Sequence, residues 1–234
     1  RYAAYKTRKN NAQILNKQTE LTALQSQINP HFLYNTLETI RGQALIDDNE
    51  EIAKMVEALS AFFRYSISRK GNLVTLRDEL ANIENYMLIQ RYRFNNRFSM
   101  EVLIDEEDEE AFDFLIPRLI IQPVVENAVK HGLRPNKGPG EVVVQAKQNM
   151  DFLEITVMDN GVGINKERLE EVQALLKSDA RIAEEDIKGM SIGVKNVSDR
   201  IKHLYGNEYG LEIDAYEGMG TIVKYWLPLI WEDV

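Results

Sequence analysis

Phe98-Ser-Met-Glu-Val-Leu-Ile104 is the first stretch of the chain in which apolar residues follow the alternating pattern of a β-strand. The residues before it show the periodicity of helices, and the residues after it switch between strand and helix patterns. Helices first and mixed elements afterwards predict two domains. The predicted fold class is α+β, with a coiled-coil linker and a helical hairpin over residues 1–96 and a two-layer α/β sandwich over residues 97–234.

Three helical segments are predicted before this strand. Residues spaced as in a heptad predict a signalling coiled coil at the start of the chain, with its seam at Ile14, Gln18, Leu21, Gln25 and Ile28. A second helix is expected from about Glu50 to Ser68, ending near Lys70-Gly71. Thr75-Leu-Arg-Asp78 resembles a capping box, so it opens a third helix that continues to about Phe94.

The second part of the chain predicts a mixed sheet with helices. Pro117 opens a helix that continues to about Lys130, because proline is favoured at the first helical position. The six consecutive acids of residues 105–110 predict a solvated loop, and residues 178–189 predict a mobile polar one. Further helices are expected at residues 166–177 and 194–205, and strands at residues 98–104, 142–146, 152–158, 211–216 and 221–227.

Composition limits the classes of function. A net charge of −9 argues against a nucleic-acid partner, because phosphate contacts need clustered lysine and arginine. The absence of cysteine excludes disulfides and thiolate metal sites, and only three histidines make a histidine-based zinc site unexpected. The basic residues that precede Glu20 suit a segment just inside a membrane, or else a solvated helix end. Because the chain starts at Arg1 without Met, we expect it to be part of a longer protein.

His31 lies in the segment Gln27-Ile-Asn-Pro-His-Phe-Leu-Tyr-Asn-Thr-Leu-Glu38. On a helix with about 100° per residue, one apolar stripe is formed by Leu33, Leu37, Ile40 and Ala44. His31 lies about 150° or more from this stripe, on the side of Asn35 and Glu38, so we expect an exposed imidazole with polar neighbours. Pro30 directly before it predicts a break in the helical hydrogen-bond ladder. An exposed histidine beside a kink is a candidate functional group, although most lone exposed histidines have no function.

Residues 24–37, Leu-Gln-Ser-Gln-Ile-Asn-Pro-His-Phe-Leu-Tyr-Asn-Thr-Leu, resemble the phosphoacceptor box of LytS/YesM-type sensor kinases, and residues 84–94 resemble the end of that family's helical region. The resemblance implies that His31 carries the phosphoryl group and that two hairpins form a dimeric four-helix bundle. Many other histidine kinases have an acid directly after the histidine, where this chain has Phe32. Glu38 is about 10 Å away along the axis, too far for direct proton transfer. Asn35, one turn away, could orient the ring or a water, and the general base stays open.

Four further segments resemble the nucleotide boxes of the GHKL (Bergerat) ATPase superfamily, which comprises gyrase, heat-shock chaperone, histidine kinase and MutL. The first is Gln122-Pro-Val-Val-Glu-Asn-Ala-Val-Lys-His-Gly132. The resemblance implies that Asn127 binds Mg²⁺ through its amide oxygen, that Lys130 meets phosphate from the same side, and that His131 lies near the adenine. In the gyrase branch a glutamate four residues before this asparagine activates water. Here that position is Pro123, which favours transfer to a residue over hydrolysis.

The second box, Asp159-Asn-Gly-Val-Gly163, follows a predicted strand. The resemblance implies that the Asp159 carboxylate accepts the adenine amino hydrogen, and that Gly161 and Gly163 let the backbone approach the ligand. The fourth box is Gly218-Met-Gly-Thr221, in which Thr221 supplies a candidate pocket hydroxyl.

The third box is Gly189-Met-Ser-Ile-Gly-Val-Lys-Asn196. The resemblance implies that backbone amides at this helix start meet phosphate oxygens, with Gly189, Gly193 and Asn196 as ATP-binding positions. Ser191 stands where the family usually has glycine, so we expect a less pliable lid.

The resemblance covers the chain from about Gln18 onward and implies a two-component sensor histidine kinase. The implied reaction is autophosphorylation of His31 by ATP with Mg²⁺, followed by transfer to an aspartate in the receiver domain of a response regulator. The implied assembly is a homodimer at the cytoplasmic face of the cell membrane, anchored by a region outside this sequence. Two alternatives stay open: a GHKL hydrolase, against which Pro123 argues, and a scaffold that binds ATP without transfer, for which Phe32 and Ser191 would be signs of decay.

Overall fold

The structure is a computed structural model that describes residues 29–68, 71–178 and 190–231. The predicted heptad seam and most of the predicted polar loop lie outside the described residues. The chain divides into two compact units, one up to Ser60 and the other from Ala61 onward. This division lies earlier than the predicted domain boundary at residues 96/97, which stays a prediction.

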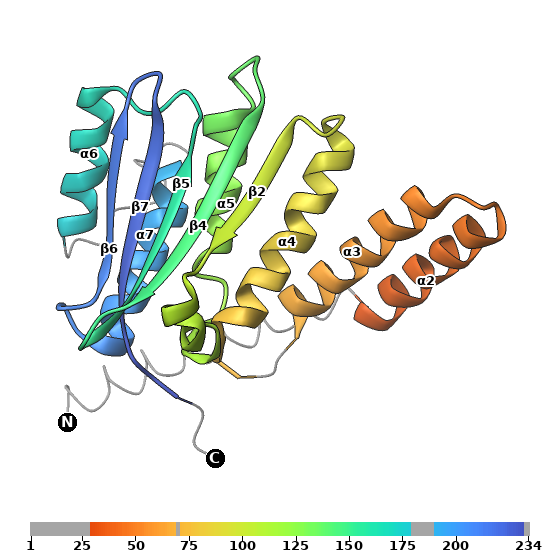
Figure 1. The fold of residues 1–234 in the computed structure, drawn as a ribbon, viewed down its shortest axis with the longest axis horizontal. Coiled ribbons are helices and arrows are strands. Elements are labelled where there is room, and N and C mark those ends of the chain that lie inside the picture. The colour runs from red at the N-terminus through yellow and green to blue at the C-terminus, as the bar shows by residue number, and fades with distance from the viewer. Residues whose placement is uncertain (1–28, 69–70, 179–189, 232–234) are drawn as a thin grey trace, which may run out of the picture. The chain divides into compact units, whose positions relative to one another are not determined.

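The first unit contains a hairpin of two helices, α2 (Pro30–Ile46) and the greater part of α3 (Glu50–Ile67), joined by residues 47–49 (Figure 1). Both helices agree with the helical pattern of the sequence. Leu37 and Ala44 of the predicted apolar stripe are buried, whereas Ile40 is 45% exposed and Leu33 is partly exposed. The stripe therefore buries only part of its surface within the described residues.

Pro30 stands at the first position of α2, which corrects the prediction of a break inside a helix. The side chain of Asn29 caps the helix by accepting hydrogen bonds from the N–H groups of His31 at 3.1 Å and Phe32 at 3.3 Å. Proline is favoured at this position because its missing N–H would have no helical partner there. The proline thus helps to start the helix that presents His31.

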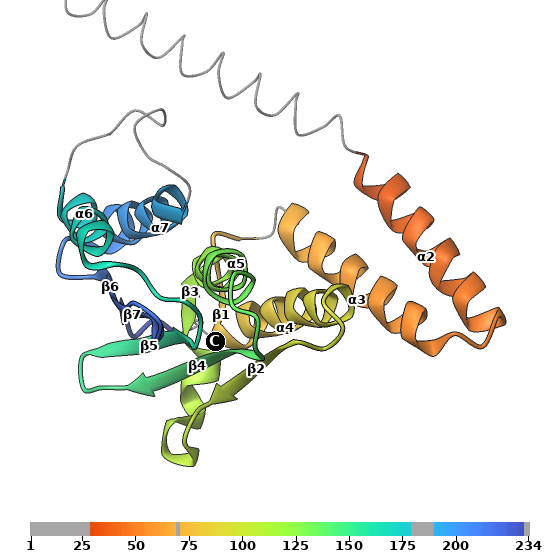
Figure 2. The same ribbon diagram turned by 90° about the horizontal axis from the view of Figure 1, so that it is seen from above.

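The second unit contains a mixed five-stranded sheet with helices on one face (Figure 2). The strand order is β2 (Phe98–Leu103), β4 (Gly140–Gln148), β5 (Phe152–Asp159), β7 (Gly220–Pro228) and β6 (Gly210–Tyr216). Strands β2 and β4 run parallel, and the other neighbouring pairs are antiparallel. The helices are α4 (Leu76–Arg93), α5 (Gln122–Asn127), α6 (Lys166–Lys177) and α7 (Met190–Tyr205). This is the predicted two-layer sandwich.

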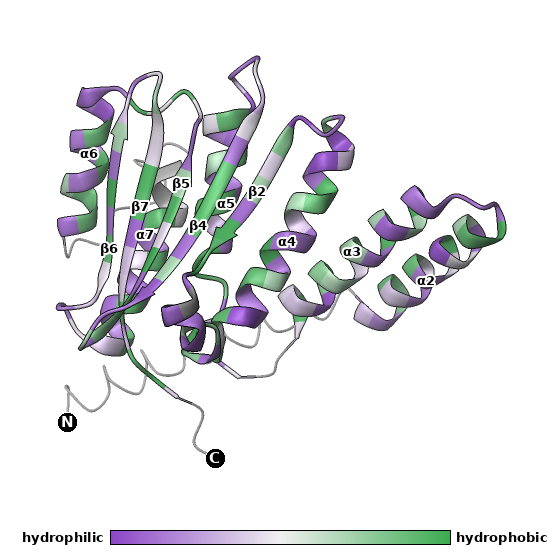
Figure 3. Cartoon of the chain, viewed as in Figure 1, coloured by the Kyte–Doolittle hydropathy of each residue, from purple (hydrophilic) through white to green (hydrophobic). Residues whose placement is uncertain are grey.

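Alternation of side chains builds the core between these layers. Along β4 the buried positions alternate with exposed or partly exposed ones, and hydrophobic and hydrophilic bands also alternate along α4 and α6 (Figure 3). The core side chains of the central strands are Val142, Val144, Ile155, Val157, Val223 and Tyr225. The Tyr225 hydroxyl donates to the Ile120 carbonyl at 3.0 Å, which satisfies its one polar group.

Two predictions between residues 72 and 133 are wrong. A short strand β1 (Leu73–Thr75) pairs with β3 (Leu115–Pro117), so Pro117 ends a strand and does not open a helix. Helix α5 begins only at Gln122, with Pro123 in its first turn, and continues as the π-helix η2 (Ala128–Leu133). In addition, the acidic run forms part of a 3₁₀-helix, η1 (Glu106–Asp113).

Helix α4 contacts the segment that precedes α5 through the buried side chain of Glu79. Its predicted start at Thr75 is confirmed, because the Thr75 hydroxyl caps the helix by accepting from the Asp78 N–H at 3.1 Å. One turn on, the carboxylate of Glu79 is fully buried and accepts from the backbone N–H groups of Leu119 at 2.9 Å and Ile121 at 3.1 Å. The Tyr65 hydroxyl of α3 also donates to it. Burial and the neighbouring Glu79 carboxylate raise the pKa of Tyr65, so this donor keeps its proton.

Leu119 explains why a carboxylate is needed in this position. Its φ of 59° is unusual for a residue with a branched side chain and costs about 1–2 kcal/mol. Glu79 stabilises this turn by accepting a hydrogen bond from the Leu119 N–H. A second buried side chain of α4, Asn82, also contacts the start of α5. The Asn82 side-chain amide donates to the Gln122 amide oxygen at 2.6 Å, and Gln122 donates in turn to Glu126 at 2.6 Å. Buried polar side chains of α4 therefore fix the start of α5.

We predict that Glu79→Ala lowers the free energy of unfolding by about 3 kcal/mol or more, since the backbone N–H groups of residues 119, 121 and 122 lose their acceptor. Urea unfolding followed by circular dichroism measures this change. Glu84→Ala on the exposed side of the same helix is the matched control and is expected to change stability by less than about 0.5 kcal/mol. Equal, small effects of the two substitutions would show that the Glu79 contacts do not hold α5.

Candidate functional site

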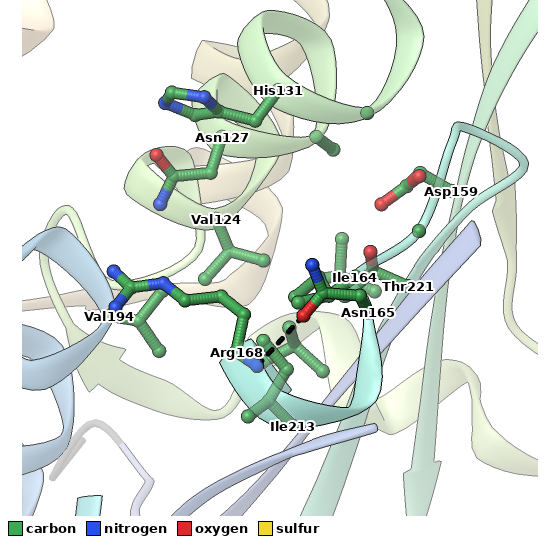
Figure 4. Close-up of a pocket in the computed structure, with 15 residues that line it drawn as sticks. Val124, Asn127, His131, Asp159, Ile164, Asn165, Arg168, Val194, Ile213 and Thr221 are labelled. Atoms are coloured by element: carbon green, nitrogen blue, oxygen red, sulfur yellow. Dashed lines mark hydrogen bonds between the residues drawn. The ribbon is translucent and has the colours of Figure 1, made fainter. Parts of the chain in front are cut away.

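A cavity of about 460 Å³ lies between the sheet and the helices α5, α6 and α7 (Figure 4). Its apolar walls come from Val124, Ala128, Val157, Ile164, Val194, Ile213 and Val223. Its polar side chains are Asn127, His131, Asp159, Asn165, Arg168 and Thr221. Apolar walls with a few polar groups are typical of a site for a small organic ligand.

Asp159 is the last residue of β5 and lies opposite Thr221 on β7. Burial raises the pKa of the Asp159 carboxyl to about 6, although hydrogen bonds from the Gly161 N–H and from Thr221 oppose this rise. The Gly161 N–H lies 2.9 Å from one carboxylate oxygen. Asp159 is thus a carboxylate that is mostly ionised at pH 7, held rigidly by its neighbours and facing an apolar cavity.

The glycines beside Asp159 are required by contacts within the chain. A Cβ at Gly161 would lie 2.4 Å from the Gly132 carbonyl carbon, and a Cβ at Gly132 would lie 2.6 Å from an Asp159 oxygen. Gly163 has a φ of 67°, and a Cβ there would meet the Tyr216 carbonyl oxygen at 1.9 Å. Only Gly163 and Gly132 of these glycines line the cavity. We predicted glycine at positions 161 and 163 because the backbone would approach a ligand there. The structure shows another reason for glycine at these positions, which is the close packing around the turn that follows Asp159.

The π-helix η2 decides which side chains of the first box reach the cavity. Asn127 ends α5 and lines the cavity together with His131, four residues on. Lys130 is exposed and does not line it. The expectation that Lys130 shares the side of Asn127 rested on α-helical spacing, whereas the wider i→i+5 turn moves Lys130 away from that side and leaves His131 on it. Burial, Lys130 and Arg134 lower the pKa of His131, so its ring is neutral at pH 7.

Helix α7 contributes Val194 to the cavity wall. Gly193 lies beside Asn127, because a Cβ there would be 3.5 Å from the Asn127 amide nitrogen. Asn196 is exposed and does not line the cavity, and Gly189 lies outside the described residues. Of the predicted ATP-binding residues, the structure therefore gathers Asn127, His131, Asp159, Gly163 and Thr221 around the cavity.

Sequence reasoning missed the contribution of α6. Asn165 caps this helix by accepting from the Arg168 N–H at 2.9 Å, and the side chains of both residues line the cavity. Asn165 three residues before Arg168 is a recognisable helix start, but nothing in that signal shows which way the helix faces. The apolar wall residues Ile164 and Ile213 could have been predicted only as core.

His31 is exposed on the first turn of α2, as predicted. Its Nδ1 atom lies 3.2 Å from the side-chain nitrogen of Asn35, one turn on. Glu38 accepts from the guanidinium of Arg41 at 3.0 Å. The polar neighbour that contacts the ring is thus Asn35, and the nearest predicted acid forms an ion pair of its own.

The described residues contain neither a metal-binding cluster nor a helix that could span a membrane. Residues 29–68, 71–178 and 190–231 contain no group of three histidine, cysteine or acidic side chains that could hold a metal ion. No helix in the same ranges is long and apolar enough to cross a membrane.

Two family models match different parts of the chain. Residues 19–98 match the family described as Histidine kinase, and residues 113–230 match the family described as Histidine kinase-, DNA gyrase B-, and HSP90-like ATPase. A histidine kinase domain from the Erythrobacter litoralis EL346 blue-light activated histidine kinase aligns with a TM-score of 0.46 and 17% identity, covering 94% of each chain.

Several sensor proteins are similar over most of this chain. Sensor histidine kinase YesM of Bacillus subtilis is 40% identical over 216 residues, which is 92% of this chain and 34% of YesM. Sensor histidine kinase YpdA of Escherichia coli is 36% identical over 89% of this chain, and sensor protein LytS of Staphylococcus epidermidis is 32% identical over 91%. The chain spans about a third of the length of these relatives, 34% in each case. On the strength of both regions and of these relatives, the chain belongs to the histidine kinase family.

Proposed function

We propose that this chain is the catalytic part of a two-component sensor histidine kinase, which transfers the γ-phosphoryl group of ATP to its own His31. One observation supports it above the others: a cavity with the Asp159 carboxylate at one end and the Asn127 amide at another, in a chain that also presents an exposed histidine. His31 belongs to the first unit and the cavity to the second. Acceptor and nucleotide site are therefore separate parts of the chain.

The Asp159 end suits an adenine. A carboxylate accepts the hydrogen of an exocyclic amino group, and the apolar walls beside it suit the faces of a planar ring. Guanine presents a carbonyl oxygen at the corresponding position, which Asp159 would repel. The neutral ring of His131 adds a flat polar group to the same cavity without a competing charge.

The Asn127 end suits the phosphates and their cation. An amide oxygen is a hard ligand of the kind that Mg²⁺ takes, and Mg²⁺ usually keeps waters and substrate phosphates in its remaining positions. Since the described residues hold no metal-binding cluster of their own, Asn127 would be the protein's contribution to such a cation. A bound Mg²⁺ would neutralise charge on the phosphates. We assign the Mg²⁺ contact to Asn127 on these grounds.

The exposed ring of His31 supplies the nucleophile. The side-chain nitrogen of Asn35 lies 3.2 Å from Nδ1, and rotation of this amide would turn its oxygen toward the ring. In the reactive tautomer Nδ1–H then donates a hydrogen bond to that oxygen and keeps its proton, so Nε2 keeps its lone pair. Nε2 forms a bond to the γ-phosphorus while the bond from this phosphorus to the β–γ bridging oxygen breaks, and ADP leaves. Asn35 thus orients the ring and takes no proton. Positioning and charge neutralisation carry most of such a transfer.

Hydrolysis is the less favoured use of the cavity. Among the described residues that line it, Asp159 is the one carboxylate, and it belongs to the adenine end. Pro123 occupies the position at which a gyrase-type enzyme has its water-activating glutamate. Within the described part of the cavity, no lining carboxylate is thus left to activate water near the phosphates.

The partners follow from the same assignment. The hairpin exposes large apolar side chains, with Phe32 at 70% and Ile46 at 77%, which supports dimerisation of two hairpins into a helical bundle. The phosphoryl group of His31 would pass to an aspartate in the receiver domain of a response regulator. We place the whole protein at the cytoplasmic face of the cell membrane, anchored by a region outside this sequence.

Asn127→Ala is predicted to remove the Mg²⁺-dependent part of ATP affinity and to leave thermal unfolding unchanged, because it deletes the amide ligand from a partly exposed helix end. Calorimetric titration with and without Mg²⁺ measures this. Asn85→Ala on the surface of α4 is the control and should behave as wild type. Retention of the full Mg²⁺ effect in Asn127→Ala would disprove the ligand assignment.

Asp159→Asn is predicted to weaken ATP binding by about one to two decades, since a charge-assisted hydrogen bond of roughly 1.5–3 kcal/mol is lost. Stability at pH 7 should not fall, because burial disfavours the ionised carboxylate. The nucleotide binds the ionised form, so wild-type affinity is complete only well above the pKa of about 6 and declines as pH falls through it. Titration of ATP itself affects both proteins and cancels in their ratio.

This ratio of wild-type to variant affinity should therefore shrink between pH 7 and pH 5. GTP provides the second comparison, because Asp159 is expected to discriminate against it. An equal loss of ATP and GTP affinity, or a ratio that does not depend on pH, would contradict the adenine assignment.

His31→Gln is predicted to abolish acid-labile phosphate incorporation from γ-labelled ATP while ATP affinity stays at the wild-type value, because glutamine has no nucleophilic nitrogen and His31 does not line the cavity. His203→Gln replaces an exposed histidine of α7 and should keep full labelling. His131→Gln should lower labelling through ATP affinity. Turnover of ATP without any labelling of the wild type would favour the hydrolase. ATP binding with neither turnover nor labelling would favour the scaffold.

A further inference from the structure

We propose that Arg168 binds the phosphate chain of the nucleotide, as the cation of this cavity. The inference rests on the proposed function, because it requires that the cavity takes ATP. Among the described residues that line the cavity, Asp159 carries the one negative charge and Arg168 the one full positive charge. The ring of His131 is neutral at pH 7, since its pKa is lowered. Charge in this cavity is thus divided between two residues.

The two charged residues lie on different sides of the cavity. Figure 4 shows Asp159 and Thr221 on one side, whereas the side chain of Arg168 extends away from them toward the side of Asn127 and Val194. ATP has the matching asymmetry, with a hydrogen-bond donor on adenine at one end and a polyanion at the other. An adenine at Asp159 would therefore direct its phosphates toward Arg168.

Local structure holds Arg168 in this place. Its backbone N–H donates to the Asn165 cap at 2.9 Å, which fixes the residue in the first turn of α6. Its Nη1 atom donates to Glu171 at 2.6 Å, and the two side chains are 35% and 65% exposed. Exposed ion pairs of this kind are weak, so exchange of the Glu171 carboxylate for a phosphate oxygen is a small change. The planar guanidinium can donate two parallel hydrogen bonds to two phosphate oxygens, whereas a lysine ammonium acts as a point charge without this fixed geometry.

This assignment also replaces a predicted contact. Lys130 was expected to meet the phosphates, but it is exposed and lies outside the set of lining residues. Without Arg168, the described part of the cavity would offer the phosphates no positive charge apart from a bound cation.

The test compares Arg168→Ala with Arg168→Lys, Glu171→Gln and Lys166→Ala by calorimetric titration of adenosine, ADP and ATP in the presence of Mg²⁺. Lys166→Ala removes one positive charge from the same turn at a side chain that is 88% exposed and does not line the cavity. For Arg168→Ala we expect ATP affinity to fall about tenfold, ADP affinity to fall less, and adenosine affinity to stay unchanged. Arg168→Lys should be intermediate, and the other two variants should bind ATP as wild type does.

Three results would overturn the proposal: unchanged ATP affinity in Arg168→Ala, an equal loss for adenosine and ATP, or a loss of the same size in Glu171→Gln. The second and third would make Arg168 a structural residue of α6, which thermal unfolding of each variant checks. Failure of the proposed function looks different, since the wild type would then show no ATP binding that depends on Asp159. Asp159-dependent ATP binding with an indifferent Arg168 removes only this inference.

Discussion

The buried carboxylate of Glu79 is the interaction on which the cavity depends. It accepts hydrogen bonds from the N–H groups of Leu119 and Ile121, immediately before α5. These bonds stabilise a turn in which Leu119 has an unfavourable positive φ. Asn127 ends the helix that starts from this turn, and the π-helix with His131 follows it. The position of the polar cavity groups of α5 and η2 thus follows from one acid of α4. The Tyr65 hydroxyl extends the same contact to α3.

The charged side chains that line the described part of the cavity, Asp159 and Arg168, lie on different sides of it. The Asp159 turn is packed so closely that Gly132 and Gly161 have no space for a side chain, which keeps its carboxylate in one orientation. Burial raises the pKa of Asp159 to about 6 and contributes most to the lowered pKa of His131. The described residues of the cavity therefore present one carboxylate with a raised pKa, one neutral ring and the Arg168 guanidinium. Such a distribution selects a ligand by its ends, with a hydrogen-bond donor at one and negative charge at the other.

Much of the fold could be predicted because side-chain periodicity and capping are local. Asp159 was predicted correctly at the end of a strand, since the turn that follows it has its own signal. Pro117 misled because proline is tolerated both at a helix start and at the end of a short edge strand. Lys130 misled because no sequence signal distinguishes a π-turn from an α-turn. Glu79 contacts a segment that is distant in sequence, and Arg168 lines a cavity whose walls come from distant segments. A charged residue on a helix is more often solvated than buried or cavity-lining.

The central claim is that His31 receives the phosphoryl group from a nucleotide held in this cavity. The most direct measurement incubates the wild-type protein with Mg²⁺ and ATP and maps the phosphate by mass spectrometry under alkaline conditions, which preserve phosphohistidine. We expect phosphate on the peptide that contains His31, located on its ring, and labelling about one to two decades slower in the Asp159→Asn protein when both proteins are treated at an ATP concentration below both dissociation constants. Phosphate on any other residue, or ATP consumption with no phosphorylated peptide, would contradict it.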